Sequence, residues 1–236
     1  MTKVVVLQSN YLPWKGYFDL IHDADMFVFY DDLQYTKNDW RNRNKFKTPK
    51  GCEWITIPAG SSQSRLICEV TLNDPSWQKQ HWNLIHQHYG KSPYFKTYAP
   101  FFEDFFLSTP RTNLSELNQH LIRHISAEFL GIGTKFVDSR DYNLSGHKLD
   151  RLVELVCKVG ATTYISGPAA KDYIEPERFR EQGIDLVWKD YSGYPGYPQS
   201  HPPFDHAVSI IDLLFCTGPN APWYIWGWRD GSAKPA

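Results

Sequence analysis

Two adjacent carboxylates begin a dense run of polar side chains near the N-terminus. Asp31 and Asp32 follow the hydrophobic run 25–30, and the polar run continues to Lys47. A carboxylate in this position can accept a proton, bind a metal ion, or hold an ammonium group or a sugar hydroxyl. Because neighbouring residues of a strand point to opposite faces, we expect only one of the two to face a cleft. The alternative is that both simply end the strand or pair with Arg41 or Arg43.

The rest of this run supplies donors that suit an anionic, hydroxyl-rich ligand. Arginine offers a planar fork for phosphate or carboxylate, and lysine offers a point charge. Asparagine amides can bind hydroxyls or a base, and aromatic rings can stack on either. The alternative is a solvated turn before a strand. The substrate-binding residues predicted here are Gln34, Tyr35, Trp40, Arg41, Asn42, Arg43, Asn44 and Lys47.

A histidine on a predicted helix is the third acid–base candidate, beside the two carboxylates. His81 follows Trp77 at helical spacing, and histidine is the natural general base near neutral pH. A helical histidine among aromatic residues is more often structural, so both interpretations stay open. His120 and His124 have the spacing of a metal pair but lack the HExxH pattern, and we predict no metal site.

Strand and helix patterns alternate along the chain, which predicts a three-layer α/β fold with a mostly parallel, Rossmann-like or nucleotidylyltransferase-like sheet. We expect one domain over residues 1–218, a helical insertion at about 74–130, and a C-terminal tail over 219–236. Strands are predicted at 3–8, 25–30, 52–58, 66–72, 136–139, 162–166 and 184–189. Helices are predicted at 14–24, 77–89, 100–107, 114–130, 148–159, 175–182 and 207–215.

The predicted strands bring several polar residues to one edge of the sheet. Ligands of open parallel sheets bind beyond the carboxyl ends of the strands. Gln8 lies at one such end, and Ser166 and Gly167 lie at another. Backbone amides after Gly167 could cradle an anion that Lys171 neutralises, although the glycine pattern is neither a P-loop nor GxGxxG. We therefore expect one site at this edge.

Composition narrows the class of partner. The net charge of −1 argues against duplex DNA or an anionic membrane as the main partner. The four cysteines are widely spaced and form no CxxC pair, and no hydrophobic run has the length of a transmembrane helix. We also predict no signal peptide and a cytoplasmic location. The aromatic fraction of 16% is high, which suits ligand clefts as well as a core.

Taken together, the motifs resemble those of the WbqC-like protein family over about residues 3–218. One departure is visible, since the family has Gln-Pro where this chain has Gln8-Ser9. The matching motifs are Leu7-Gln8, Tyr11-Leu12-Pro13-Trp14, Gly16-Tyr17-Phe18, Asp31-Asp32, Gln34-Tyr35, Trp40, Asn42-Arg43-Asn44, Trp77, His81, Ser166-Gly167-Pro168, Lys171, Tyr173, Tyr197, Gln199, Ser209 and Asp212-Leu213-Leu214.

The resemblance implies a transferase that modifies a nucleotide-activated amino sugar in O-antigen or related surface-polysaccharide pathways. The plausible reaction is transfer of an aminoacyl group, such as glycyl, to the sugar amine. The resemblance adds Tyr11, Tyr173, Tyr197 and Gln199 to the substrate-binding candidates. It points to Asp31, Asp32 or His81 as the group that deprotonates the attacking ammonium.

A weaker fold-level analogy concerns the first loop, where nucleotidylyltransferases carry two histidines around a glycine. Here Trp14 and Tyr17 occupy those positions, so that nucleotide-activating chemistry is not expected, and Lys15 is the remaining substrate-binding candidate there. Two other classes of function stay open. One is a non-catalytic module that binds a nucleotide or an aminoacyl-tRNA, and the other is an RNA-binding protein. A tRNA-borne acyl donor is one option, and the sequence names no cofactor.

Overall fold

The structure is a computed structural model that describes residues 1–231 and 233–234. Its strands are β1 (Lys3–Leu7), β2 (Met26–Phe29), β3 (Arg43–Thr48), β4 (Gly51–Thr56), β5 (Lys135–Asp138), β6 (Thr163–Ser166) and β7 (Asp185–Trp188). Its α-helices are α1 (Lys15–His22), α2 (Ser76–Tyr89), α3 (Phe95–Leu107), α4 (Leu114–His124), α5 (Lys148–Lys158), α6 (Pro176–Arg180) and α7 (Ile210–Thr217). Short 3₁₀ turns and one π-helical turn at Ile125–Phe129 complete the assignment.

Five strands form a fully parallel sheet in the order β5-β2-β1-β6-β7. Counted along the chain within this sheet, the order is 3-2-1-4-5, which is the order of the Rossmann fold. The predicted three-layer α/β fold is confirmed. The strand order reverses between β1 and β6, because the chain leaves β1 through α1 toward β2 and leaves β6 through α6 toward β7. Such a reversal opens a crevice at the carboxyl ends of the two central strands.

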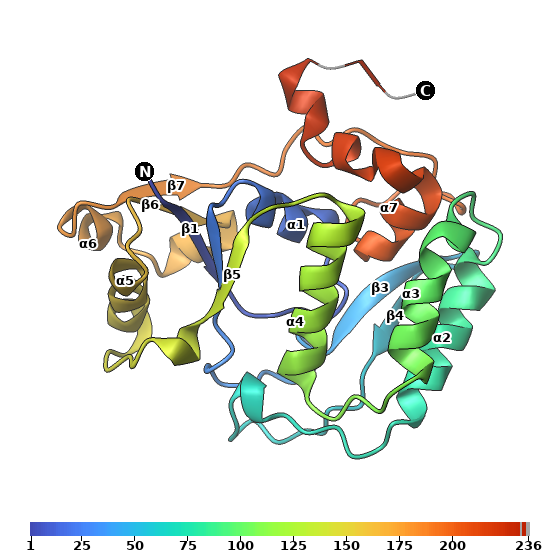
Figure 1. Ribbon diagram of the computed structural model, residues 1–236, viewed down its shortest axis with the longest axis horizontal. Helices are drawn as coiled ribbons and strands as arrows, with labels where there is room; N and C mark the ends of the chain where they lie inside the picture. Colours follow the sequence, from blue (N-terminus) through green and yellow to red (C-terminus); the bar gives the residue numbers. More distant parts are fainter. Residues whose placement is uncertain (232, 235–236) are drawn as a thin grey trace.

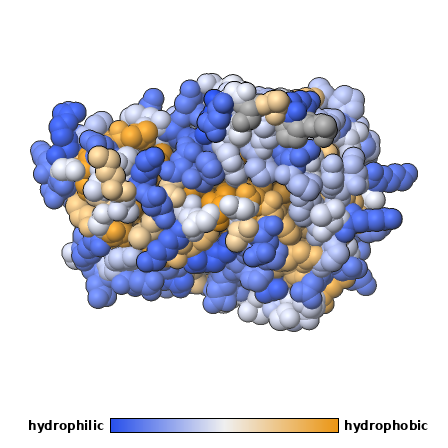
Figure 2. Space-filling view, turned by 45° about the horizontal axis from the view of Figure 1, so that its top comes forward, coloured by the Kyte–Doolittle hydropathy of each residue, from blue (hydrophilic) through white to orange (hydrophobic). Residues whose placement is uncertain are grey.

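Helices cover both faces of the sheet, with α5 and α6 on one side and α1 and α4 on the other (Figure 1). Alternation along β1 explains this arrangement: Val4 and Val6 pack with α5, while Val5 packs with α1. Every one of these valines is buried. On the face drawn in Figure 2, hydrophobic residues gather in patches that hydrophilic side chains separate.

A large insertion lies between β2 and β5 and includes a two-stranded hairpin of β3 and β4 beside α2, α3 and α4 (Figure 1). The hairpin is antiparallel and separate from the main sheet, with Arg43 opposite Thr56. Two expectations need correction here. The polar segment 43–48, for which no strand was predicted, is a strand, and the predicted strand 66–72 is a 3₁₀ turn at Ile67–Glu69 with isolated bridges at Leu66 and Thr71.

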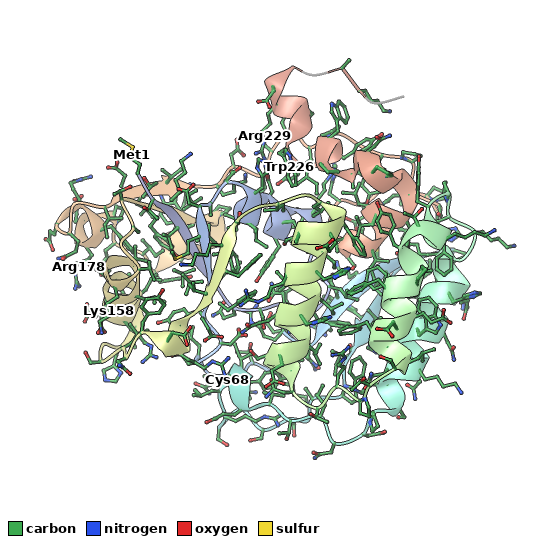
Figure 3. The ribbon with its side chains drawn as sticks, in the orientation of Figure 1. Met1, Cys68, Lys158, Arg178, Trp226 and Arg229 are labelled. Carbon is green, nitrogen blue, oxygen red and sulfur yellow. The ribbon has the colours of Figure 1, made fainter. Side chains whose placement is uncertain are left out.

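The segment after α7 folds back on the first helix as two 3₁₀ turns, Gly218–Tyr224 and Gly227–Asp230. Ala221 and Ile225 are fully buried, so this part of the expected tail belongs to the core. Arg229 forms an ion pair with Asp19 of α1, and Trp226 stacks on His22 at 4.0 Å between ring centroids. Figure 3 labels Arg229 and Trp226 on this side of the molecule. Residues 232, 235 and 236 of the predicted tail lie outside the described residues.

Over residues 1–231 and 233–234, no helix combines the length and the hydrophobicity that a membrane span requires.

Candidate functional site

A cavity of about 640 Å³ opens at the carboxyl ends of β1 and β2, beside Tyr164 of β6. We call it the switch-point cavity, and its walls include Gln8, Tyr30, Leu33, Leu149, Tyr164 and Tyr173. A smaller hollow of about 110 Å³ adjoins it and includes the predicted residues Ser166 and Gly167. Both hollows share Tyr173. The expected edge of the sheet therefore carries a cavity, at the position where Rossmann-type folds bind nucleotides.

Two tyrosines give this cavity its polar and aromatic character. Tyr173 is 65% exposed at the rim, so one face of its ring is available for stacking. Tyr30 is 7% exposed, and its hydroxyl makes no hydrogen bond within the described residues. Burial raises the pKa of Tyr30 to about 12, and the charge of the nearby Arg151 partly opposes that rise, so the phenol stays protonated. Lys148 and Glu175 add exposed charges at the same cavity.

Arg41 comes from the segment between β2 and β3 and reaches the end of β1. Its Nη2 donates to Gln8 Oε1 at 3.3 Å, and its Nη1 donates to Asn10 Oδ1. Burial raises the pKa of Tyr173, and the positive charge of Arg41 partly offsets that rise, which places the two side chains near each other. Asp39 lies 3.7 Å from the guanidinium and is its only carboxylate partner among the described residues. Arg41 is therefore the cation best placed to meet an anion at the switch point.

Asp31 is fully buried, and both oxygens of its carboxylate accept hydrogen bonds. Its Oδ1 accepts from the Ser9 backbone N–H at 2.7 Å, while its Oδ2 accepts from Ser115 Oγ and from Gln119 Nε2 at 3.2 Å. The carboxylate thus fastens the loop after β1 to α4. A carboxylate that is shut from solvent and bonded on both oxygens positions that loop and does not meet a substrate.

Asp32 points the other way, as the alternation of a strand predicts. Its Oδ1 accepts from Ser139 Oγ, and its Oδ2 pairs with the Arg151 guanidinium of α5. The Asp32 side chain is 12% exposed. It flanks Leu33, which lines the switch-point cavity, so Asp32 is the acidic candidate that lies nearest the site.

His81 lies in the aromatic core rather than at the sheet edge. The side chain is 4% exposed, with Nδ1 2.8 Å from Tyr11 Oη and Nε2 3.2 Å from the Thr56 carbonyl oxygen. Since a carbonyl only accepts, Nε2 carries the proton and Nδ1 accepts from the fully buried Tyr11. Burial lowers the pKa of His81 to about 4. His81 and Tyr11, which were both predicted as site residues, therefore hold α2 against the first loop and the hairpin.

The polar residues of the hairpin mostly bind backbone. Asn42 Nδ2 donates to the Ile57 carbonyl oxygen at 2.8 Å, and Asn44 Nδ2 donates to the carbonyl oxygens of Tyr11 and Leu12. The Lys47 ammonium is buried and donates to the Pro203 carbonyl oxygen. These contacts satisfy loop carbonyls inside the protein, which explains amides and a lysine where a strand would otherwise carry hydrophobic side chains.

The exposed part of the same segment is aromatic and basic. Trp40 and Trp54 are 40% and 45% exposed, and their ring centroids are 5.3 Å apart. The Arg43 guanidinium lies over Trp54 at 4.1 Å. Gln34 Nε2 donates to the Gln63 carbonyl oxygen on the surface, whereas Tyr35 is fully buried. Lys171 is exposed and lies over the Trp188 ring at 5.6 Å, turned toward β7.

Three predicted residues gather in a different place, beside α7. Tyr197 Oη and Gln199 Nε2 donate to Asp212 Oδ2 at 2.7 and 2.9 Å. Lys15 is 2% exposed and lies over the rings of Tyr194 and Tyr197 at 4.7 and 5.4 Å. Burial lowers the pKa of Lys15 to about 8, and the nearby Asp19 partly opposes that shift. This cluster joins α1 to α7 and is separate from the switch-point cavity.

Asp19, His22 and Asp23 of the same region bring three potential metal ligands within 4.8 Å of one another. Lys189 already lies 2.9 Å from Asp19, and Arg229 pairs with both aspartates. Hydrogen bonds to His22 and Lys189 outweigh burial and lower the pKa of Asp23 to about 2. Two fixed cations neutralise the two carboxylates, so the cluster repels a further cation.

The model of the WbqC-like protein family matches residues 8–224. The chain belongs to that family. The resemblance of its motifs is confirmed, over nearly the stretch expected. The chain is also similar to the "Uncharacterized protein Rv1507c" of Mycobacterium tuberculosis (strain ATCC 25618 / H37Rv), with 43% identity over 228 residues, which cover 95% of this chain and 98% of that protein. No solved structure matches the chain.

In this member of the WbqC-like family, the predicted site residues divide among several places. Gln8, Arg41, Ser166, Gly167 and Tyr173 meet at the switch point, and Asp32 lies next to it. Asp31 anchors the loop after β1 to α4, and Lys171 lies near β7. The others lie in the aromatic core, in or near the hairpin, or beside α7. Four residues that were not predicted lie at or next to the switch point: Asn10, Tyr30, Tyr164 and Lys148. The carboxyl ends of predicted strands mark Tyr30 and Asn10, whereas no sequence signal marks Lys148.

Proposed function

We propose that the protein is a transferase that modifies a nucleotide-activated amino sugar for surface-polysaccharide or a related pathway, by acylating the sugar amine. The observation that carries the proposal is the 640 Å³ cavity at the reversal of a 3-2-1-4-5 sheet. Tyr173 at its rim suits a base, and Arg41, which donates to the lining residue Gln8, suits phosphate. Membership of the WbqC-like family is compatible with this activity but does not itself specify a reaction.

In the proposed reaction the amine nitrogen attacks the acyl carbon of an activated donor, an amide bond forms, and the donor oxygen leaves. The amine must lose a proton. None of the three predicted acid–base residues has a free acceptor atom, since Asp31 and His81 are buried and hydrogen-bonded and Asp32 accepts from Ser139 and Arg151. We therefore assign the proton to the leaving donor oxygen. We include a cytoplasmic location in the proposal, because all four cysteines are unpaired.

The proposal predicts that a nucleoside diphosphate amino sugar stabilises the protein against heat and gains the mass of an acyl group when aminoacyl donors are supplied. Uridine and thymidine diphosphate amino sugars are the probes, with the free amino sugar as a negative control. Absence of any nucleotide-dependent stabilisation would refute the proposal.

Replacement of Tyr173 by alanine is expected to weaken nucleotide binding about tenfold, since stacking of a base on an aromatic ring contributes roughly 1–3 kcal/mol. The fold should survive, because the side chain is 65% exposed. Titration calorimetry measures the change. Leu107→Ala is the matched control, since Leu107 is an exposed hydrophobic residue at the end of α3. Equal affinities for the two variants would remove Tyr173 from the site.

One observation favours a second function, a non-catalytic module that binds a nucleotide or an aminoacyl-tRNA. Two of the three predicted acid–base residues are buried and hydrogen-bonded. That function predicts stabilisation by nucleotides with no product under any donor. Mass spectrometry of the same incubations separates the two functions.

A further inference from the structure

A second, smaller pocket lies beside the switch-point cavity. Its volume is about 210 Å³, and its walls are Asn10, Pro13, Trp14, Trp40, Asn44 and Ala207. We call it the indole pocket. Indole rings offer flat apolar faces, which suit the C–H faces of a sugar ring, and an amide between them suits a hydroxyl. The Asn10 amide nitrogen donates no hydrogen bond to any described residue, so it is available to such a ligand.

Trp14 forms a fixed wall of this pocket. Its ring lies 5.1 Å from Tyr191 and 6.1 Å from Tyr194 between centroids, edge to face in both cases. A Cβ atom added at Gly16 would overlap the Trp14 indole, so only glycine at this position leaves the ring where it is. The glycine of the motif Trp14-Lys15-Gly16 therefore leaves room for the Trp14 ring to form one wall of the pocket.

Arg41 connects the two hollows. It donates from one nitrogen to Gln8, which lines the switch-point cavity, and from another to Asn10, which lines the indole pocket. Its side chain is 14% exposed, and its only carboxylate partner among the described residues is Asp39, at 3.7 Å. A guanidinium with five donors between two hollows matches the diphosphate between a nucleoside and its sugar.

We infer that the ligand lies across both hollows, with the nucleoside in the switch-point cavity, the diphosphate on Arg41 and the hexose ring in the indole pocket. This inference rests on the proposed function and adds the place of the sugar. The acceptor amine of the hexose then lies between Trp14 and Trp40, on the hairpin side of Arg41. The acyl donor must approach from the open side of that pocket, where Trp40 is 40% exposed.

Calorimetric titration with uridine diphosphate and with uridine diphosphate glucosamine tests the inference. The wild-type protein should bind the sugar nucleotide about tenfold more tightly than the nucleotide alone. Trp40→Ala should keep the affinity for uridine diphosphate and lose that increment. Gly16→Ala, which displaces Trp14, should do the same. Arg41→Ala should weaken both ligands by about 10- to 100-fold, since it removes charged hydrogen bonds to phosphate.

Trp54→Ala is the matched control, because Trp54 is as exposed as Trp40 and packs against it but does not line the pocket. It should leave both affinities unchanged. If uridine diphosphate binds but the sugar adds no affinity, or if Trp54→Ala acts like Trp40→Ala, the inference fails while the proposed function stands. If uridine diphosphate does not bind, both fail. Loss of single-stranded RNA binding in both tryptophan variants, without a sugar effect, would overturn the inference in favour of an RNA surface.

Discussion

Replacement of Asp31 by alanine is expected to lower the free energy of unfolding by about 4 kcal/mol. The side chain is fully buried and accepts hydrogen bonds from the Ser9 backbone, Ser115 and Gln119. Alanine would leave these three donors inside the protein without their acceptor and would add a small void. The loop that carries Gln8 and Asn10 would lose its anchor to α4, so ligand binding should fall as well.

Urea denaturation followed by circular dichroism measures this loss. Asp31→Asn should fall between wild type and Asp31→Ala, because its oxygen still accepts from Ser9 while its amide meets the donor of Gln119. Asp104→Ala on the exposed surface of α3 is the matched control and should change stability by less than about 0.5 kcal/mol. If Asp31→Ala is as stable as Asp104→Ala, Asp31 does not hold the loop.

Acidification is expected to destabilise the protein through His81. An unfolded histidine titrates near pH 6.5, whereas burial lowers the pKa of His81 in the folded protein to about 4. Between these two values the unfolded chain binds a proton that the folded protein does not. The free energy of unfolding therefore falls as the pH drops from about 6.5 to about 4, by up to about 3 kcal/mol from this residue. Below pH 4 its contribution changes no further.

His81→Gln tests this pH dependence, because glutamine keeps a donor and an acceptor for the Thr56 carbonyl and the Tyr11 hydroxyl without titrating. The difference between wild type and variant should shift by about 3 kcal/mol between pH 7 and pH 4. His86→Gln, on the exposed face of the same helix, should show no such shift. A His81→Gln profile parallel to that of the wild type would contradict the prediction.

The parallel sheet was predictable because each of its strands is a short hydrophobic run with a polar residue at its end. Val4, Val5 and Val6 are buried on both faces, which is the pattern of a covered parallel strand. The end of α5 was also predictable, because a glycine commonly follows the last turn of a helix. Gly160 takes this place and has a φ of +74°, which favours glycine. Both the buried strands and the helix end depend on residues that are neighbours in the sequence, so the sequence alone is enough to predict them.

The strand β4 was predicted at 52–58, but its partner β3 was not predictable, because most of its buried positions are polar. Asn44 and Lys47 face the interior and bind backbone carbonyls of loops at residues 11–12 and 203. Only the tertiary structure brings those carbonyl groups to Asn44 and Lys47. From the sequence alone, these polar side chains indicate a solvent-exposed segment. The same reason explains His81 and Asp31: their residue types suit catalysis, but burial and partners from distant segments determine what they can do.

The neutralisation of Asp19 has a consequence for the order in which the chain can acquire its structure during synthesis. Asp19 is buried in the first helix, yet its partners Tyr194 and Arg229 lie 175 and 210 residues later in the chain. A nascent chain that ends before them would bury a carboxylate without its partners, which is strongly unfavourable. We therefore expect α1 to reach its final packing only once the segment that carries Tyr194 and Arg229 can fold against it.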